Sequence, residues 1–237
     1  MRILHRYITE PHPCAYLEKR IAMLEYSFVE SMKAQEYEDL MNRGYRKFGA
    51  AFFRPVCGPC QKCRPMRLDV NLFRPDRSQR RNWKRNQDLE VRLAEPVIDD
   101  QRMKLYRTYH EAQAGRKGWP IQKMDIEEYR MTFVYNPIPS IEISLWEEGV
   151  LRGVVITDVT PNTISGIYHY HDFSQSARGL GIYCMLQMIE LAKRMNRRWI
   201  YFGYYVAGCS SMDYKASFKP CEIMDTNLVW KPFIPEI

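Results

Sequence analysis

Three closely spaced cysteines form a compact group of reactive side chains. Cys57, Cys60 and Cys63 lie in the segment RPVCGPCQKCRP, among cationic residues and prolines. A C-x-x-C-x-x-C run with a remote fourth cysteine is typical of iron–sulfur ligation, whereas structural zinc usually takes paired ligands from two knuckles. The spacing leaves two interpretations open: a site for an iron–sulfur cluster or zinc, and a set of reduced, metal-free thiols in a tight turn.

A basic segment follows the cysteines, FRPDRSQRRNWKRNQDLEVR, in which Asp76 is the one early acid. Ser78 is suited to cap a helix start, and three- and four-residue spacings then align cations on one helix face. The cations of the segment are Arg74, Arg77, Arg80, Arg81, Lys84 and Arg85. Because compensating acids are few, we interpret this face as a phosphate-binding surface for nucleic acid in preference to a solvated helix face. Trp83 would either stack on a base or anchor the helix in the core.

Polar side chains gather in two stretches of the second half. In YHYHD, strand alternation places Tyr168, Tyr170 and Asp172 on one face, and His169 and His171 on the other. The second stretch, GYYVAGCSSMDYK, follows an apolar run and supplies Tyr204, Tyr205, Gly208, Ser210, Tyr214 and Lys215. For each tyrosine, ordinary core packing is the alternative to a role in chemistry, and we interpret the two histidines as structural or exposed.

Composition places the chain among ordinary globular proteins. It has 237 residues, of which 46% are hydrophobic, and a net charge of +7. The first residues lack the apolar core of a signal peptide, and no later stretch is long and apolar enough to cross a bilayer. Seven cysteines without an export signal favour reduced thiols. We therefore expect a cytoplasmic protein with no membrane partner.

Hydrophobic periodicity predicts helices and strands in two halves. In the first half, strands are expected over 20–31, 50–56, 66–73 and 88–95, with helices over 33–44 and from Ser78. In the second half, helices are expected over 99–114, 125–135, 179–195 and 210–218, a three-stranded meander over 140–172, and strands over 199–206 and 226–232. The predicted fold class is α+β, with an N-terminal domain over 1–97 that carries the cysteine loop and the basic helix, and a second domain over 98–237.

The order of elements in the second half, with QSARGLG opening the long helix, resembles the GNAT acyltransferase fold. In that fold a glycine-rich loop at a helix N-terminus directs backbone amides at an anionic cofactor. The resemblance implies a mixed, mainly antiparallel sheet, and it leaves coenzyme A open as a ligand.

Five longer strings occur together in this order: PHPCAYL, EYEDLMNRGYRKFG, FRPVCGPCQKCRPMR, FRPDRSQRRNWKRN and YFGYYVAGCSSMDYKASFKP. Together they resemble the aminoacyl-tRNA–protein transferases of the N-degron pathway, whose bacterial branch transfers leucine and whose eukaryotic branch transfers arginine. The resemblance implies transfer of leucine from leucyl-tRNA to proteins that begin with Asp or Glu, which marks them for degradation. The reaction requires no ATP and no other cofactor, because the ester of the charged tRNA is already activated.

The resemblance gives the candidate residues their expected roles. Asp172 would hold or deprotonate the incoming ammonium, and Tyr170, Tyr204 or Tyr205 would steady the ester or the terminal adenosine. The tRNA would contact the basic segment (Arg77, Arg80, Arg81, Lys84 and Arg85) and the start of the long helix at Arg178 and Gly181. Candidates for reading the acidic N-terminus are Arg46, Arg54, Arg67 and Arg178, with Lys215 behind them. Met185 and Met188 would line a leucine pocket or simply pack in the core, and Cys14 would be the fourth metal ligand.

Three alternatives stay open at this point. Arginine is the second candidate for the transferred amino acid. An acetyltransferase that uses acetyl-CoA would bind coenzyme A without any dependence on tRNA. A metal- or cluster-bearing RNA-binding protein would bind tRNA in a salt-sensitive way and form no product.

Overall fold

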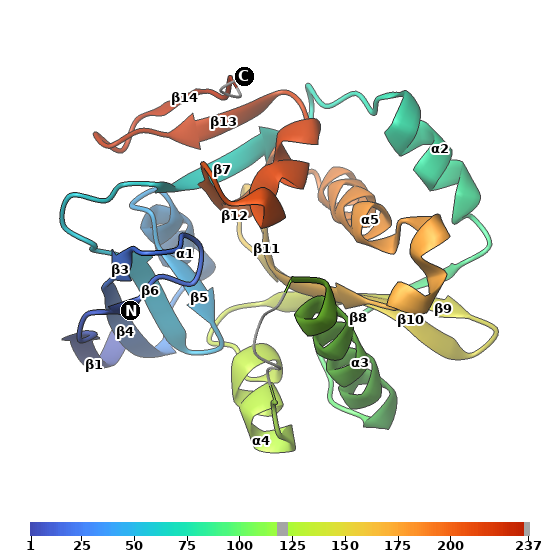
Figure 1. Ribbon diagram of the computed structural model, residues 1–237, viewed down its shortest axis with the longest axis horizontal. Helices are drawn as coiled ribbons and strands as arrows, with labels where there is room; N and C mark the ends of the chain where they lie inside the picture. Colours follow the sequence, from blue (N-terminus) through green and yellow to red (C-terminus); the bar gives the residue numbers. More distant parts are fainter. Residues whose placement is uncertain (118–122, 235–237) are drawn as a thin grey trace.

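The computed structural model of the protein describes residues 1–117 and 123–234, and its strands form sheets of eight, four and two strands (Figure 1). The largest sheet is mixed and mostly antiparallel. Its strands, in spatial order, are β14 (Trp230–Pro232), β13 (Cys221–Met224), β7 (Cys63–Asp69), β12 (Trp199–Val206), β11 (Thr163–His171), β10 (Val150–Val159), β9 (Ser140–Glu147) and β8 (Glu90–Ala94). Among the described strand pairs of this sheet, only β11 and β12 run parallel. The prediction of a mixed, mainly antiparallel sheet is confirmed.

The N-terminal segment forms the two smaller sheets. The four-stranded sheet contains, in spatial order, β1 (Arg2–Ile8), β4 (Leu24–Ser31), β6 (Ala51–Pro55) and β5 (Arg46–Phe48). The short strands β2 (His12–Pro13) and β3 (Ile21–Ala22) pair with each other. Helix α1 (Ala34–Met41) packs against the four-stranded sheet through Tyr37, which meets Phe52 edge-on at 5.4 Å between ring centroids.

Helices cover both faces of the large sheet, and alternation along the strands decides which residues they meet. On β10, Val155 belongs to the core beneath α5 (Leu180–Arg194), whereas Val154 and Ile156 belong to the core beneath α3 (Asp100–Lys117) and α4 (Ile126–Tyr129). Helix α2 (Arg77–Arg85) packs on the outer side of α5 (Figure 1). Three short helical segments complete the chain: η1 (Arg130–Val134), η2 (Phe173–Arg178) and η3 (Ser210–Ser217).

The start of α2 differs from the prediction. Asp76, not Ser78, is the N-cap, since its carboxylate accepts a hydrogen bond from the Gln79 backbone N–H at 2.8 Å. The Gln79 side chain in turn accepts from the Asp76 backbone N–H at 2.9 Å, which completes a capping box. The one early acid of the basic segment therefore stabilises the helix terminus.

The large sheet takes strands from both sides of residue 97. Strands β7 and β8 precede this residue, yet β7 pairs with β12 and β8 pairs with β9. The division into domains at 97 stays a prediction. No helix in the described ranges combines the length and apolar character that a bilayer crossing requires.

Candidate active site

The central feature of the large sheet is the point where its two parallel strands separate. Residues 163–165 of β11 pair with residues 199–201 of β12. Beyond this point β11 stays paired with β10 as far as His171, whereas β12 stays paired with β7 as far as Val206. A cavity of about 1090 Å³ lies at the opening, lined by Gly166 of β11 and Gly203 of β12 among others.

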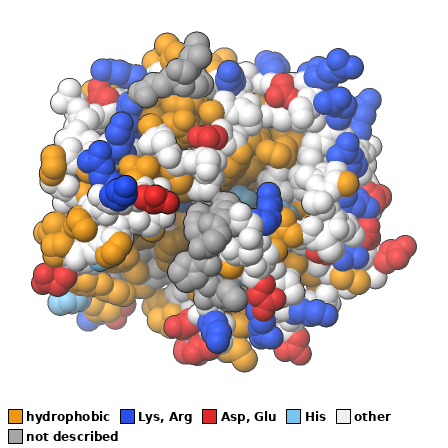
Figure 2. Space-filling model, in the orientation of Figure 1, with side chains coloured by type: hydrophobic (Ala, Val, Ile, Leu, Met, Phe, Trp, Pro, Cys, Tyr) orange, Lys and Arg blue, Asp and Glu red, His pale blue; other side chains and the backbone are white. Residues whose placement is uncertain are grey.

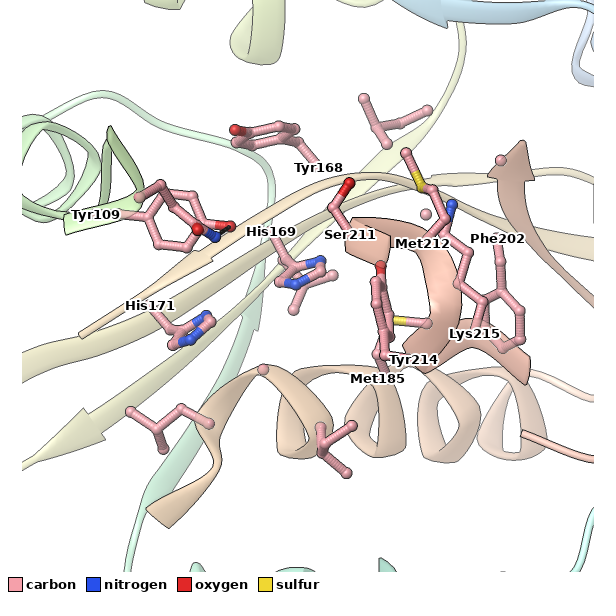
Figure 3. A pocket seen from close by; sticks show the side chains of 18 of the residues that line it. Tyr109, Tyr168, His169, His171, Met185, Phe202, Ser211, Met212, Tyr214 and Lys215 are labelled. Atoms are coloured by element: carbon pink, nitrogen blue, oxygen red, sulfur yellow. Dashed lines mark hydrogen bonds between the residues drawn. The ribbon is translucent and has the colours of Figure 1, made fainter. Parts of the chain in front are cut away.

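One wall of the cavity is apolar. It consists of Ile182, Met185 and Met188 of α5 together with Phe202 and Tyr214. Figure 3 shows Met185 and Tyr214 side by side above α5. The predicted lining role of Met185 and Met188 agrees with this placement, although both also belong to the core beneath α5. The wall could accommodate an aliphatic side chain.

Two histidines form a second wall. His169 and His171 line the cavity on the β11 side (Figure 3). Burial lowers the pKa of His169 to about 4, with a further contribution from the Lys215 charge, and lowers the pKa of His171 to about 3. His171 packs closely on the first turn of α5. A Cβ atom added at Gly181 in that turn would lie only 3.0 Å from the His171 ring. Both imidazoles are therefore neutral at pH 7.

Arg46 is a buried cation at the sheet opening. Its guanidinium donates to Ser165 Oγ at 2.9 Å and to the Gly166 carbonyl, and its side chain is almost fully buried. The Gly203 backbone lies close to this guanidinium, since a Cβ atom added at Gly203 would lie 3.4 Å from it. Within residues 1–117 and 123–234, no carboxylate forms an ion pair with Arg46. The next residue, Lys47, differs because its Nζ lies 3.2 Å from the Asp158 carboxylate.

Lys215 enters the cavity from η3. Its Nζ donates to the Tyr204 carbonyl at 2.6 Å, and its residue is only 5% exposed. Burial, and secondarily the charge of Arg46, lowers the pKa of Lys215 to about 7. Figure 3 shows the side chain reaching toward Met212. At neutral pH this amine exists in both protonation states.

The structure separates the three candidate tyrosines. The Tyr204 ring lines the cavity, and its hydroxyl donates to the Gly44 carbonyl at 2.7 Å. The Tyr170 hydroxyl lies 2.6 Å from that of Tyr129, in the core beneath α3 and α4. Tyr205 packs on Phe233 and lines a second cavity, of about 490 Å³. Of the three, Tyr204 is the one placed beside the other candidate residues.

Asp172 lies at the rim of the cavity in an ion-pair network. Partial burial opposes its ionisation, but hydrogen bonds from the Ser174 backbone and from Arg152 outweigh burial and lower the pKa of Asp172. Arg152 also pairs with Glu147 at 2.8 Å, and Glu147 pairs with Arg178 at 2.6 Å. Asp172 is thus an ionised carboxylate already held by a cation.

The remaining arginine candidates have carboxylate partners. Arg54 pairs with Glu25 at 2.7 Å. Arg67 pairs with Glu222 at 2.6 Å, and its guanidinium carbon lies 3.8 Å from the centroid of the Trp199 ring. Neither Arg54 nor Arg67 is among the described residues that line the cavity. Arg178 pairs with Asp88 at 2.7 Å as well as with Glu147.

Helix α2 carries an exposed basic face on the outer side of α5. The predicted tRNA contacts Arg77, Arg80, Arg81, Lys84 and Arg85 are all exposed, and within the described chain none forms an ion pair with a carboxylate. Figure 2 shows Lys and Arg side chains grouped on this part of the surface, at the upper right. Trp83 anchors the helix, since its ring lies 5.5 Å from that of Tyr183 on α5.

A side-chain amide fixes α2 to the turn before α5. Asn82 Nδ2 donates to the carbonyls of Arg178 and Gly179, each at 2.9 Å. Gly179 has a φ of +63°, and a Cβ there would lie 2.7 Å from Asn82 Nδ2. Glycine is therefore required at this turn for both conformational and steric reasons. Helix α2 is thereby fixed to the N-terminus of α5, which lines the cavity.

The cysteine segment and α2 lie at opposite ends of the molecule (Figure 1). Burial, together with the neighbouring thiols of Cys14, Cys57 and Cys60, raises the pKa of Cys63 to about 12. Cys14 therefore lies near Cys63. In the described part of the chain, however, no group of three or more His, Cys, Asp or Glu side chains has an arrangement that could hold a metal ion. Metal binding stays a prediction, and no step below depends on it.

Several lining residues were not predicted from the sequence: Tyr16, Phe48, Phe53, Tyr109 and Arg116. They come from a loop, from the N-terminal sheet and from α3, which lie far apart in the sequence. Tyr109 follows the helical spacing of α3, a pattern that indicates core packing equally well. No local signal distinguishes these residues from core or surface positions.

Comparisons with known proteins identify the family of the chain. Residues 12–81 match the family described as "Arginine-tRNA-protein transferase, N terminus", and residues 101–225 match "Arginine-tRNA-protein transferase, C terminus". The chain is 35% identical over 234 residues to "Aspartate/glutamate leucyltransferase" of Saccharophagus degradans, with 98% of each chain covered. It is 32% identical over 219 residues to the protein of that name in Campylobacter jejuni strain RM1221, with 92% of each chain covered.

Among solved structures, FemX resembles the fold, with a TM-score of 0.50 and 7% identity over 90% of this chain and 84% of that chain. At this identity the likeness concerns the fold alone. The two family matches and the relatives that extend over nearly the whole chain bear on activity, and they confirm the resemblance found in the sequence motifs. The chain therefore belongs to the arginine-tRNA-protein transferase family and is an aminoacyltransferase of the kind that transfers an amino acid from aminoacyl-tRNA to protein.

Proposed function

We propose that this enzyme transfers leucine from leucyl-tRNA to the N-terminal Asp or Glu of proteins. The observation that carries the proposal is Arg46, a buried guanidinium on the cavity wall that makes no ion pair with a carboxylate in the described chain. A buried cation without a partner is costly in a folded protein unless a ligand supplies the opposite charge. The names of the curated relatives support an acidic acceptor.

Arg46 is better suited than Lys215 to read the acceptor carboxylate. A guanidinium stays charged and offers a planar fork of donors that matches a carboxylate. Two contacts, to Ser165 and Gly166, hold Arg46 in place while further N–H groups remain for a ligand. Lys215 is partly neutral at pH 7 because of its lowered pKa.

The apolar wall favours leucine over arginine as the transferred residue. Ile182, Met185 and Met188 offer an aliphatic surface, which would gain from removing a leucine side chain from water. Asp172 is the one carboxylate among the described lining residues, and Arg152 already pairs with it. An arginyl side chain would therefore find no free counter-charge in the cavity.

The donor tRNA would approach along the edge formed by α2 and the start of α5. The exposed cations of α2 suit phosphates of the acceptor stem, and the N-terminus of α5 presents partial positive charge at Gly181. On this approach the 3′ end of the tRNA, with its aminoacyl ester, would reach the sheet opening. The acceptor would then enter from the side of Arg46.

The chemistry requires one proton transfer. The acceptor α-amino group has an ordinary pKa near 8, so part of it is neutral at pH 7–8. Its nitrogen attacks the ester carbon, a C–N bond forms, the C–O bond to the ribose breaks, and the proton from nitrogen ends on the ribose oxygen. Neutral Lys215 Nζ can accept this proton and return it, while Asp172 at the rim attracts the incoming ammonium.

The proposed function also includes an assignment of the large sheet and the N-terminal segment to two structural units. We infer that the large sheet and α5 form a GNAT-like transferase unit, because parallel strands separate at the cavity and a helix N-terminus faces it. The four-stranded sheet and the cysteine segment would be an N-terminal domain that supplies Arg46 to the site.

A transfer assay with a panel of charged tRNAs tests the proposal. Leucyl-, arginyl- and phenylalanyl-tRNA are each incubated with the enzyme and peptides that begin with Asp, Glu or Asn. We expect extension with leucyl-tRNA and an acidic first residue only. Extension with arginyl-tRNA alone would identify arginine as the transferred residue. Extension of the Asn peptide at the same rate as the Asp and Glu peptides would refute recognition by Arg46. Acetyl-CoA in place of tRNA serves as the control for an acetyltransferase.

A further inference from the structure

One face of the four-stranded sheet carries an aromatic ring on every strand. Tyr7 of β1, Tyr26 of β4, Phe53 of β6 and Phe48 of β5 follow one another with ring-centroid distances of 5.4, 5.5 and 5.7 Å. We call these four residues the aromatic row. Tyr7 is 40% exposed and Phe48 is 37% exposed, so the row is accessible at both ends.

The aromatic row leads to the cavity. Phe48 and Phe53 line the cavity, and Arg46 is the direct cross-strand partner of Phe53. Phe53 is in turn the partner of Tyr26, and Tyr26 is the partner of Tyr7. Directly paired residues share a face of a sheet, so Arg46 stands on the same face as the row. Figure 2 shows apolar side chains bordering a hollow on this side of the molecule, left of the centre.

The charges around the row suit a polypeptide better than a nucleic acid. Among the cations on these strands, Arg2, Arg54 and Lys47 pair with Glu30, Glu25 and Asp158. Arg6 pairs in register with Ser27, one position from Tyr7, and so points to the other face. A single-stranded nucleic acid would require cations along the row for its phosphates. Helix α2, which carries exposed cations, instead lies at the opposite end of the molecule from the four-stranded sheet (Figure 1).

We propose that the aromatic row binds the acceptor protein just after its acidic first residue and favours apolar side chains at the third and fifth positions. The inference rests on the proposed function, since it takes Arg46 as the group that holds the first side chain. From β5 to β1 the row spans three strand spacings, roughly 14 Å, which is the length of about four extended residues. Side chains alternate along an extended chain, so the third and fifth point to the same side as the first.

Three peptides of matched length test this register with the native enzyme and leucyl-tRNA. All begin with Asp; one has leucine and phenylalanine at positions three and five, one has them at positions two and four, and one has serine at all four positions. We expect kcat/KM to be about three- to tenfold higher for the first peptide than for the second, because only the first buries apolar surface on the row. Equal values for the first two peptides would overturn the proposal.

Two variants locate the effect. Tyr7→Ser and Tyr26→Ser should each bring the ratio between the first two peptides toward one, with KM for leucyl-tRNA unchanged. Leu93→Ser, at a residue 45% exposed on β8, is the matched control and should keep the full ratio. Tyr7 is exposed on an edge strand, so its variant serves even where Tyr26→Ser does not fold.

A raised KM for leucyl-tRNA in the variants, with an unchanged ratio, would assign the row to RNA and refute the proposal. Absence of transfer to all three peptides would instead overturn the proposed function itself, and this inference with it.

Discussion

Replacing Lys215 by methionine should make the protein more stable at pH 7 and much less active. The ordinary pKa of a lysine side chain is 10.5, and burial lowers that of Lys215 to about 7. The difference corresponds to roughly 4 kcal/mol of lost stability at pH 7. Loss of the hydrogen bond from Nζ to the Tyr204 carbonyl costs about 1–2 kcal/mol. The net expectation for Lys215→Met is a gain of about 2–3 kcal/mol.

The pH dependence of the free energy of unfolding separates the cost of burying the Lys215 charge from the loss of its hydrogen bond. Between pH 7 and 10.5 the unfolded chain binds a proton on Lys215 that the folded protein lacks, so the free energy of unfolding rises with pH in the native protein. The advantage of Lys215→Met should therefore shrink by about 3 kcal/mol between pH 7 and 9.5. Urea unfolding at several pH values measures it, with Lys193→Met, an exposed lysine on α5, as the control. A constant difference across this range would refute the buried, partly neutral lysine.

The same variant tests the proposed proton transfer. In the native enzyme kcat should rise with pH through about 7 as Lys215 loses its proton. In Lys215→Met the turnover should fall by about 10²–10⁴-fold and this limb of the profile should disappear. Turnover within twofold of native, with the limb in place, would remove Lys215 from the mechanism and leave Asp172 as the candidate.

Three further predictions concern the acceptor, the tRNA and the turn before α5. Arg46→Gln should raise KM for acidic peptides by about tenfold or more and leave KM for leucyl-tRNA unchanged, with Arg46→Lys losing less; equal effects on both substrates in steady-state kinetics would contradict the assignment. Replacing Arg80, Arg81 and Lys84 of α2 together by glutamine should weaken tRNA binding. The slope of log K against log salt should fall by about 2–3, as measured by filter binding across a salt titration. Gly179→Ala should lower the free energy of unfolding by about 1–2 kcal/mol, because a φ of +63° disfavours a side chain and the new Cβ would meet a side-chain amide of α2; an unchanged urea midpoint would contradict this.

Sequence periodicity predicted most of the helices and strands because these elements bury one face against a neighbour. The meander, α5 and β12 are bounded by turn residues and carry apolar side chains at regular intervals. Strands β1 and β13 escaped prediction for different reasons. In β1, an edge strand, six of seven residues are exposed, and its apolar residues come in pairs separated by His and Arg. Such a strand has no buried face to leave a pattern. Strand β13 is largely buried but only four residues long.

The candidate site was only partly predictable, since its residues meet through the topology of the large sheet. The two polar stretches of the second half pointed to Tyr204, Lys215 and Asp172, and the structure places all three on the cavity. Strand alternation correctly separated Tyr170 from His169, yet residue type did not say which face would line the site. The opening between β11 and β12 depends on where pairing stops, which no local pattern specifies.

Arg46 and Lys47 show why charge alone could not identify the specificity residue. The two cations are adjacent on β5, and both are buried. Lys47 has its counter-charge in Asp158, which is also fully buried, so the pair is neutral as a unit. Arg46 has two neutral acceptors, the Ser165 hydroxyl and the Gly166 carbonyl, and therefore keeps a net charge in the cavity. Among the described residues one buried cation is paired with a carboxylate and its neighbour is not, and we interpret the second as reserved for an anionic ligand, whose charge the acidic first residue of an acceptor supplies.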